Sequence, residues 1–86
     1  MIIGVAVKEG DLMICLPKPN RHHHCIMYAV TVLGLIPPIG AAEGAQGFYT
    51  AQGEFLNRTE ALAHAIKHDQ LISIKAKHEL FSEDLW

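Results

Sequence analysis

Two short apolar runs separated by a charged turn constrain the fold of this chain more than any other feature. Residues 2–7 and 12–16 are rich in Val, Ile and Leu, and Lys8-Glu9-Gly10-Asp11 lies between them. Glycine supplies the backbone freedom that a tight turn needs, so the pattern predicts a β-hairpin. Because both runs are apolar at nearly every position, we expect the strands to be covered on both faces or to lie centrally in a sheet.

A helix is predicted after this hairpin. Pro17 and Pro19 end the second strand, because proline cannot donate a hydrogen bond to a neighbouring strand. Asn20 is a good N-cap, and Gly34 suits the C-terminal end of the helix. The expected buried stripe consists of Ile26, Val30 and Leu33.

Residues 35–46 form a connection dense in Gly, Pro and Ala, longer than most loops in small domains. Two interpretations stay open. Such loops are often functional or mobile, or else Leu35, Ile36 and Ile39 cover one end of the core.

The pattern of a hairpin followed by a helix then recurs. Residues 47–57 predict two strands joined at Gln52-Gly53, and Asn57 with Glu60 three residues later is typical of a capping box. The expected apolar side of the second helix is formed by Ala61, Leu62, Ala65 and Ile66.

The C-terminal part completes the predicted fold. The alternating run 71–75 suggests a further strand, and Ser82 before Glu83 and Asp84 suits the start of one helical turn, docked by its apolar neighbours. The order ββαββα therefore predicts an α+β fold in which two helices pack on a mostly antiparallel sheet. The length of 86 residues indicates a single domain, 1–86, which self-association into a homo-oligomer would stabilise further.

Charge and cysteine content exclude several classes of protein. The formal net charge of -2 argues against a general binder of nucleic acid polymers. Two cysteines, Cys15 and Cys25, are too few for the disulfide framework of a small secreted domain and suggest reduced thiols. The apolar run at the N-terminus is too short for a membrane helix, so we expect no membrane partner.

The candidate site is the cluster at the predicted start of the first helix: Asn20, Arg21, His22, His23 and His24. No Asp or Glu occurs from Leu12 to Ala42. Free amides and the positive end of a helix dipole attract anions, and arginine and neutral histidine are good phosphate ligands. The cluster therefore predicts a site for phosphate groups.

The cluster has three other interpretations. His22 or His23 with Cys25 has too few ligands at the wrong spacing for zinc, so we expect neither a metal nor a cofactor. Paired histidines are also used as general acid and base in nucleotide cleavage, but nothing else completes such a site, and no catalytic residue is assigned. The structural alternative is that one histidine packs on the core while the others face water.

Residues outside the cluster add to the candidate site. Arg58, in the first turn of the second helix, is either a second phosphate ligand or the partner of Glu54 or Asp84. Tyr49 or Phe48 offers a ring on which a base can stack, although strand alternation puts at least one of them in the core. The spacing of His64 and His68 suits a shared metal, but a solvated helix face is the favoured interpretation.

Three segments carry a resemblance to a known family. They are P19-N-R-H-H-H-C-I, G47-F-Y-T-A-Q-G-E-F-L-N-R-T-E-A-L-A and L80-F-S-E-D-L-W86. Together they resemble a family of small uncharacterised proteins of tailed bacteriophages, over most of the chain. The resemblance implies expression in the cytoplasm of the infected bacterial host and implies no activity.

These observations predict a protein that binds a phosphate-bearing nucleotide signal of host antiviral defence, and the resemblance supplies the defence context. The first alternative is a protein that binds a host protein through its hairpin and its C-terminus. The second is a nucleotide-cleaving enzyme that uses paired histidines.

Overall fold

The computed structural model describes residues 1–68, 70 and 79–86. Its elements are β1 (Ile2–Glu9), β2 (Leu12–Pro17), α1 (His22–Thr31), β3 (Gln46–Thr50), β4 (Phe55–Asn57), α2 (Arg58–Lys67) and a 3-10 helix η1 (Ser82–Asp84). The predicted α+β class, the order ββαββα and the C-terminal turn are therefore confirmed. The predicted strand at 71–75 lies outside the described residues.

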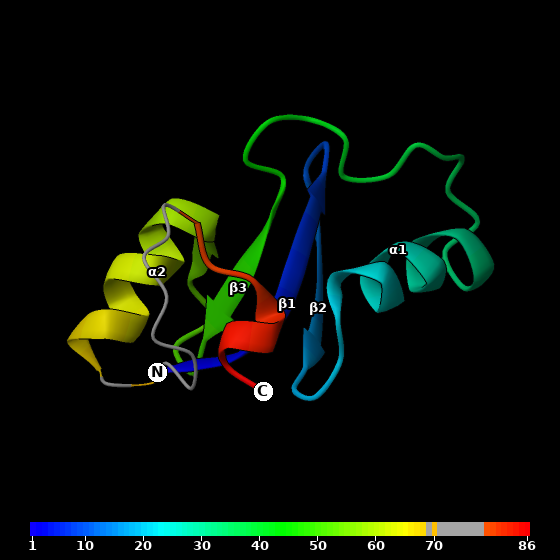
Figure 1. Ribbon diagram of the computed structural model, residues 1–86. Coiled ribbons are helices and arrows are strands. Elements are labelled where there is room, and N and C mark those ends of the chain that lie inside the picture. The colour runs from blue at the N-terminus through cyan, green and yellow to red at the C-terminus, as the bar shows by residue number, and fades with distance from the viewer. Residues whose placement is uncertain (69, 71–78) are drawn as a thin grey trace.

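The four strands form one antiparallel sheet in the order β2-β1-β3-β4 (Figure 1). The central strand β1 is buried along most of its length, as its apolar pattern predicts. In contrast, β2 is an edge strand and leaves Leu12 and Met13 exposed. The central position predicted from the apolar runs is therefore confirmed for β1 and wrong for β2.

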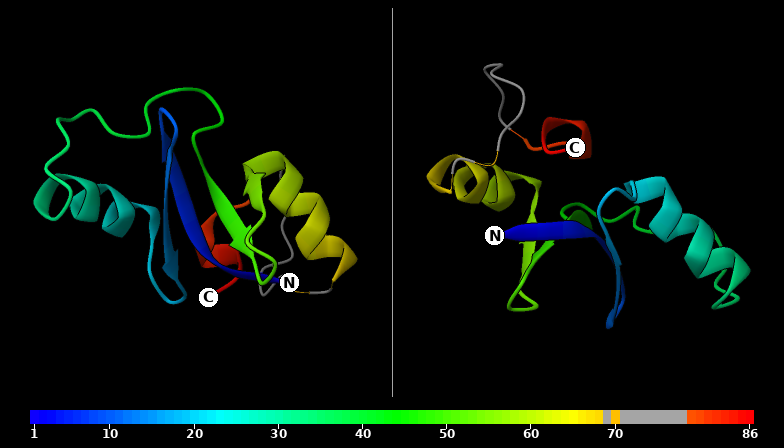
Figure 2. Two further views of the ribbon diagram at one scale, coloured as in Figure 1. Left: turned by 180° about the vertical axis from the view of Figure 1, so that it is seen from behind. Right: turned by 90° about the horizontal axis from the view of Figure 1, so that it is seen from below.

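Both helices and the C-terminal turn lie on the same face of the sheet (Figure 2). Each helix places two small residues against the strands, Cys25 and Ala29 on α1 and Ala61 and Ala65 on α2, and all four are fully buried. Small side chains let a helix approach the sheet closely. They pack around a core formed by Ile2, Val5, Val7, Ile14, Ile39, Phe48 and Leu80.

The predicted buried stripe of α1 is wrong at two positions. Val30 is 37% exposed and Leu33 is 43% exposed, whereas Ile26 is partly buried. The helix is instead rotated so that Cys25 and Ala29 face the sheet. On α2, Ala61 and Ala65 are buried as predicted, but Ile66 is 62% exposed.

The N-cap of α2 is the residue that the sequence predicts, whereas the N-cap of α1 is not. Asn57 accepts from the Glu60 amide and Glu60 accepts from the Asn57 amide, so the predicted capping box of α2 is confirmed. The N-cap of α1 is Arg21 rather than Asn20. The ring of His24 reaches back and accepts from the Arg21 amide at 2.8 Å, which fixes the helix start one residue later.

The opposite face of the sheet carries two aromatic rings above glycines. A Cβ on Gly4 would lie 2.5 Å from the Tyr49 ring, and a Cβ on Gly47 would lie 2.8 Å from the Phe55 ring. The rings therefore occupy the space that side chains at these glycines would need. Tyr49 thus faces away from the helices, while its neighbour Phe48 is fully buried beneath them.

The C-terminal turn is docked, as predicted. Leu80 is fully buried, and its amide donates to the Arg58 main-chain oxygen at 3.1 Å. The Trp86 ring meets the Phe48 ring edge to face, with centroids 6.3 Å apart. Among the described residues, no helix is both long and apolar enough to span a membrane.

Candidate ligand-binding site

Arg21 ties the start of α1 to the C-terminal turn. Its guanidinium donates to the Ser82 hydroxyl at 3.0 Å and to the main-chain oxygen of Trp86 at 2.6 Å. The Trp86 indole returns a hydrogen bond to the Asn20 main-chain oxygen at 3.1 Å. Two N–H groups of the Arg21 guanidinium are therefore engaged in hydrogen bonds within the protein.

His22 is built into the core. It is only 8% exposed, its Nε2–H donates to the Gly47 main-chain oxygen at 2.7 Å, and its ring meets Phe48 edge to face. Burial lowers the pKa of His22 below its ordinary value of 6.5, and the nearby positive charge of Arg58 lowers it further. The hydrogen bond to Gly47 and the charge of Glu83 oppose this shift without cancelling it. His22 is thus a neutral histidine that joins α1 to β3.

The lowered pKa of His22 makes stability depend on pH. The unfolded chain takes up a proton at His22 near pH 6.5, before the folded chain does. We expect the free energy of unfolding to fall as the pH drops below about 6.5, until His22 also titrates in the folded state. His22→Gln retains an N–H donor but does not titrate, so its loss of stability between pH 7.5 and 5.5 should be smaller. Denaturant titrations at both pH values measure the difference, and equal losses in the two proteins would contradict the assignment.

The other two histidines of the cluster have different positions. His24 caps the helix, and its ring lies 4.0 Å from that of His23, centroid to centroid. His23 is exposed. The neighbouring Cys25 is buried, and burial raises its pKa to about 11, so it carries a thiol rather than the thiolate that binds metals.

Arg58 lies at the first position of α2, on the other side of the C-terminal turn. Its Nη2 donates to the Gln46 side chain at 3.0 Å, and its guanidinium stacks over the Phe81 ring, 5.0 Å from the centroid. Its Nε is shielded from solvent and has no hydrogen-bond partner among the described residues. A buried N–H without a hydrogen bond lowers stability, because it has lost its contact with water and gained no acceptor.

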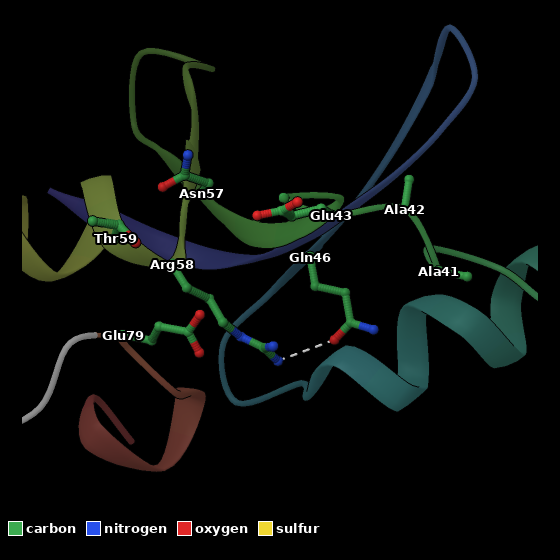
Figure 3. Close-up of a pocket in the computed structure, with 9 residues that line it drawn as sticks. Ala41, Ala42, Glu43, Gln46, Asn57, Arg58, Thr59 and Glu79 are labelled. Atoms are coloured by element: carbon green, nitrogen blue, oxygen red, sulfur yellow. Dashed lines mark hydrogen bonds between the residues drawn. The ribbon is translucent and has the colours of Figure 1, made fainter.

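A pocket of about 570 Å³ opens beside Arg58 (Figure 3). Its wall combines the start of α2, the start of β3 and the loop before it, and it is lined by Ala41, Ala42, Glu43, Gly44, Gln46, Asn57, Arg58, Thr59 and Glu79. Figure 3 shows the Arg58 side chain reaching from α2 toward Gln46. The volume lies in the range of pockets that bind small molecules.

The predicted cover of the core by the 35–46 loop is confirmed at two of its three apolar residues, and a role of the loop in ligand binding stays a prediction. Ile39 is buried and Leu35 packs on the core, while Ile36 is 85% exposed. Residues 41–44 instead line the pocket. Gly40, with φ +67°, makes the turn between these parts, where a Cβ would lie 2.5 Å from Val7.

The structure brings some of the candidate residues together and separates others. Arg21, His22 and Arg58 lie on the helix-covered face around the C-terminal turn, but of these only Arg58 lines the pocket. Tyr49 lies on the opposite face. Asn20 donates its side-chain amide to the Pro17 oxygen.

Sequence reasoning missed five polar residues of the pocket wall: Glu43, Gln46, Asn57, Thr59 and Glu79. Asn57 and Thr59 flank Arg58 at a recognisable helix start, so their positions were accessible from the capping box. The other three come from segments that meet only in the folded chain.

His64 of α2 and His68, the C-cap of that helix, are the remaining pair of possible metal ligands. The rings of His64 and His68 lie 4.3 Å apart, centroid to centroid, and burial lowers the pKa of His64. Within the described part of the chain, no group of three or more His, Cys, Asp or Glu side chains is placed to hold a metal ion.

The fold and the pocket together define a small α+β protein with a polar, ligand-sized pocket at the start of its second helix. Comparison with protein families then places the chain. The family model described as phage T4 y16D protein matches residues 1–86, and the chain belongs to this family. No curated protein and no solved structure matches it.

Proposed function

We propose that this phage protein binds a phosphate-bearing nucleotide in the pocket beside Arg58 and sequesters it in the cytoplasm of the infected bacterium. The observation that carries the proposal is a pocket of about 570 Å³ whose wall includes Arg58 at the first position of α2. Membership of a phage family suggests that the ligand is a nucleotide signal of host antiviral defence.

The phosphate would bind at Arg58. Its guanidinium is held by Gln46 and Phe81, so little side-chain freedom is lost when a ligand binds. The positive end of the α2 dipole lies at the same point, and Thr59 adds a hydroxyl. Arginine is well suited to this role because its planar fork matches two phosphate oxygens.

The pocket wall also restricts the kind of phosphate. Glu43 and Glu79 place two carboxylates beside the single guanidinium among the lining residues described. Carboxylates repel a triphosphate, which carries several charges, but they accept hydrogen bonds from ribose hydroxyls and base amino groups. The wall thus favours a nucleotide with one charge per phosphate, such as a phosphodiester, over a nucleoside triphosphate.

A thermal-shift screen of cyclic and linear nucleotides tests the proposal. A ligand at a hundred times its dissociation constant adds about 2.7 kcal/mol of stability, which is readily detected. We expect Arg58→Met, which keeps an unbranched side chain but removes the guanidinium over Phe81, to weaken binding at least tenfold. Lys67→Met removes the same charge at the far end of α2 and should bind like the wild type.

Several results would count against the proposal. If no nucleotide raises the melting temperature, or if the two variants bind equally well, the pocket is not the site. A host protein that copurifies in stoichiometric amount would instead favour the protein-binding alternative. Turnover of a bound nucleotide that is lost on substituting His22 or His23 would favour the nucleotide-cleaving enzyme.

A further inference from the structure

The C-terminal turn, residues 80–86, supports the Arg58 side chain. The Leu80 amide donates to the Arg58 main-chain oxygen at 3.1 Å, and the Arg58 guanidinium lies over the Phe81 ring, 5.0 Å from its centroid. The Gln46 side chain, at the start of β3, accepts from the same guanidinium. The place of the guanidinium in the pocket wall therefore depends on the turn staying docked.

Arg21 holds the other end of the same turn. Its guanidinium donates to the Ser82 hydroxyl at 3.0 Å and to the Trp86 main-chain oxygen at 2.6 Å. Hydrogen bonds donated by a charged group contribute more to stability than those between neutral groups. Ser82 is buried, so water does not readily replace the guanidinium there. Removal of the Arg21 guanidinium would therefore loosen the turn.

We propose that Arg21 is a positioning residue for Arg58: it keeps the C-terminal turn docked, and the docked turn keeps the Arg58 guanidinium in the pocket wall. Arg21 is not among the described residues that line the pocket, so its effect passes through the turn. The consequence for ligand binding rests on the proposed function. A protein whose binding-competent form is only partly populated binds its ligand more weakly by that fraction.

The arginine content of the chain makes the position of Arg58 directly measurable. Arg21 and Arg58 are the only two arginines. An NMR spectrum of the arginine Nε–H groups therefore contains these two signals, and in an Arg21 variant it contains that of Arg58 alone. The Arg58 Nε is shielded from solvent, so we expect its proton to exchange slowly with water. Loss of turn docking would expose this group and speed the exchange.

Arg21→Met tests the inference by removing both hydrogen bonds to the turn. We expect the exchange of the Arg58 Nε–H to quicken roughly tenfold, because the group is exposed whenever the turn opens. Trp86, the only tryptophan, should also become more accessible to acrylamide as a fluorescence quencher. Arg21→Lys keeps a charged donor and should give smaller changes. The matched control is Lys18→Met, which removes the same charge from an exposed side chain and should behave like the wild type.

Titration with cyclic AMP, as a phosphodiester probe, connects the position of Arg58 with binding. We expect Arg21→Met to bind it about tenfold more weakly than the wild type, and Lys18→Met to bind it equally well. Gly10→Ala, in the turn between β1 and β2, lowers stability without touching the C-terminal turn and should also bind like the wild type. Circular dichroism confirms that each variant is folded at the temperature of the titration.

Unchanged exchange of the Arg58 Nε–H in Arg21→Met would refute the inference, whatever the chain binds. So would an equal change in Lys18→Met, since charge alone would then account for it. If the exchange quickens in Arg21→Met but no nucleotide binds the wild type, the proposed function fails and the positioning of Arg58 by Arg21 stands. Should Arg21→Met not fold, Arg21→Lys takes its place, and exchange as slow as in the wild type would then contradict the inference.

Discussion

Phe48→Ala is expected to destabilise the protein by about 4 kcal/mol, as is typical when a large buried ring is deleted. Phe48 is fully buried at the centre of the sheet. Its ring meets His22 of α1 at 5.1 Å and Trp86 of the C-terminal segment at 6.3 Å, both edge to face. Its removal would leave a cavity where α1, β3 and the C-terminal turn meet.

The matched control for this substitution is Phe55→Ala in the partner strand of the same hairpin. Phe55 is half-buried on the opposite face, with the Lys8 ammonium 4.3 Å from its ring centroid. We expect a loss of about 1–2 kcal/mol, because less apolar surface is exposed and no enclosed cavity forms. Denaturant titrations compare the two variants, and equal losses would mean that Phe48 is not the centre of the core.

Gly47→Ala is expected to cost about 3 kcal/mol through overpacking. A Cβ at this position would collide with the Leu56 main-chain oxygen and lie 2.8 Å from the Phe55 ring. The main chain of β4 would have to move, and β4 ends at Asn57, directly before Arg58. The Gly47 oxygen is also the acceptor for His22. We therefore expect Gly47→Ala to weaken nucleotide binding as well as stability.

Gly10→Ala separates crowding from backbone strain. Gly10 has φ +61° and open space where a Cβ would lie, so alanine there should cost only about 1 kcal/mol. Urea unfolding measures the stability of both variants, and the thermal-shift assay measures their ligand binding. If Gly47→Ala loses no more stability than Gly10→Ala, close contact between the strands at Gly47 makes no contribution.

Local sequence patterns were sufficient for most of the fold. Both hairpins follow from glycine-containing turns between apolar runs, and the start of α2 follows from Asn57 and Glu60, because these signals act within four residues. The docked C-terminal turn follows from its apolar residues. The start of α1 was one residue off because a histidine, which is not a usual capping residue, takes the capping role.

Local patterns were not sufficient for the rotation of α1. Its sequence is apolar on nearly all sides, so several stripes of similar hydrophobicity compete, and the small residues Cys25 and Ala29 face the sheet. Close packing decided the rotation of α1, because small side chains allow the helix to approach β1 most closely. The larger Val30 and Leu33 are therefore exposed.

What the sequence by itself determined is the set of local elements, their order and the presence of cationic residues at two helix starts. Only the tertiary structure decided which of these cations lines the pocket. Arg21 is bonded to Ser82 and Trp86, more than sixty residues away, whereas Arg58 meets Gln46 and the loop at 41–44. The reason is physical: contacts between distant segments depend on how the helices and the C-terminal turn pack on the sheet, and no short-range pattern encodes that packing.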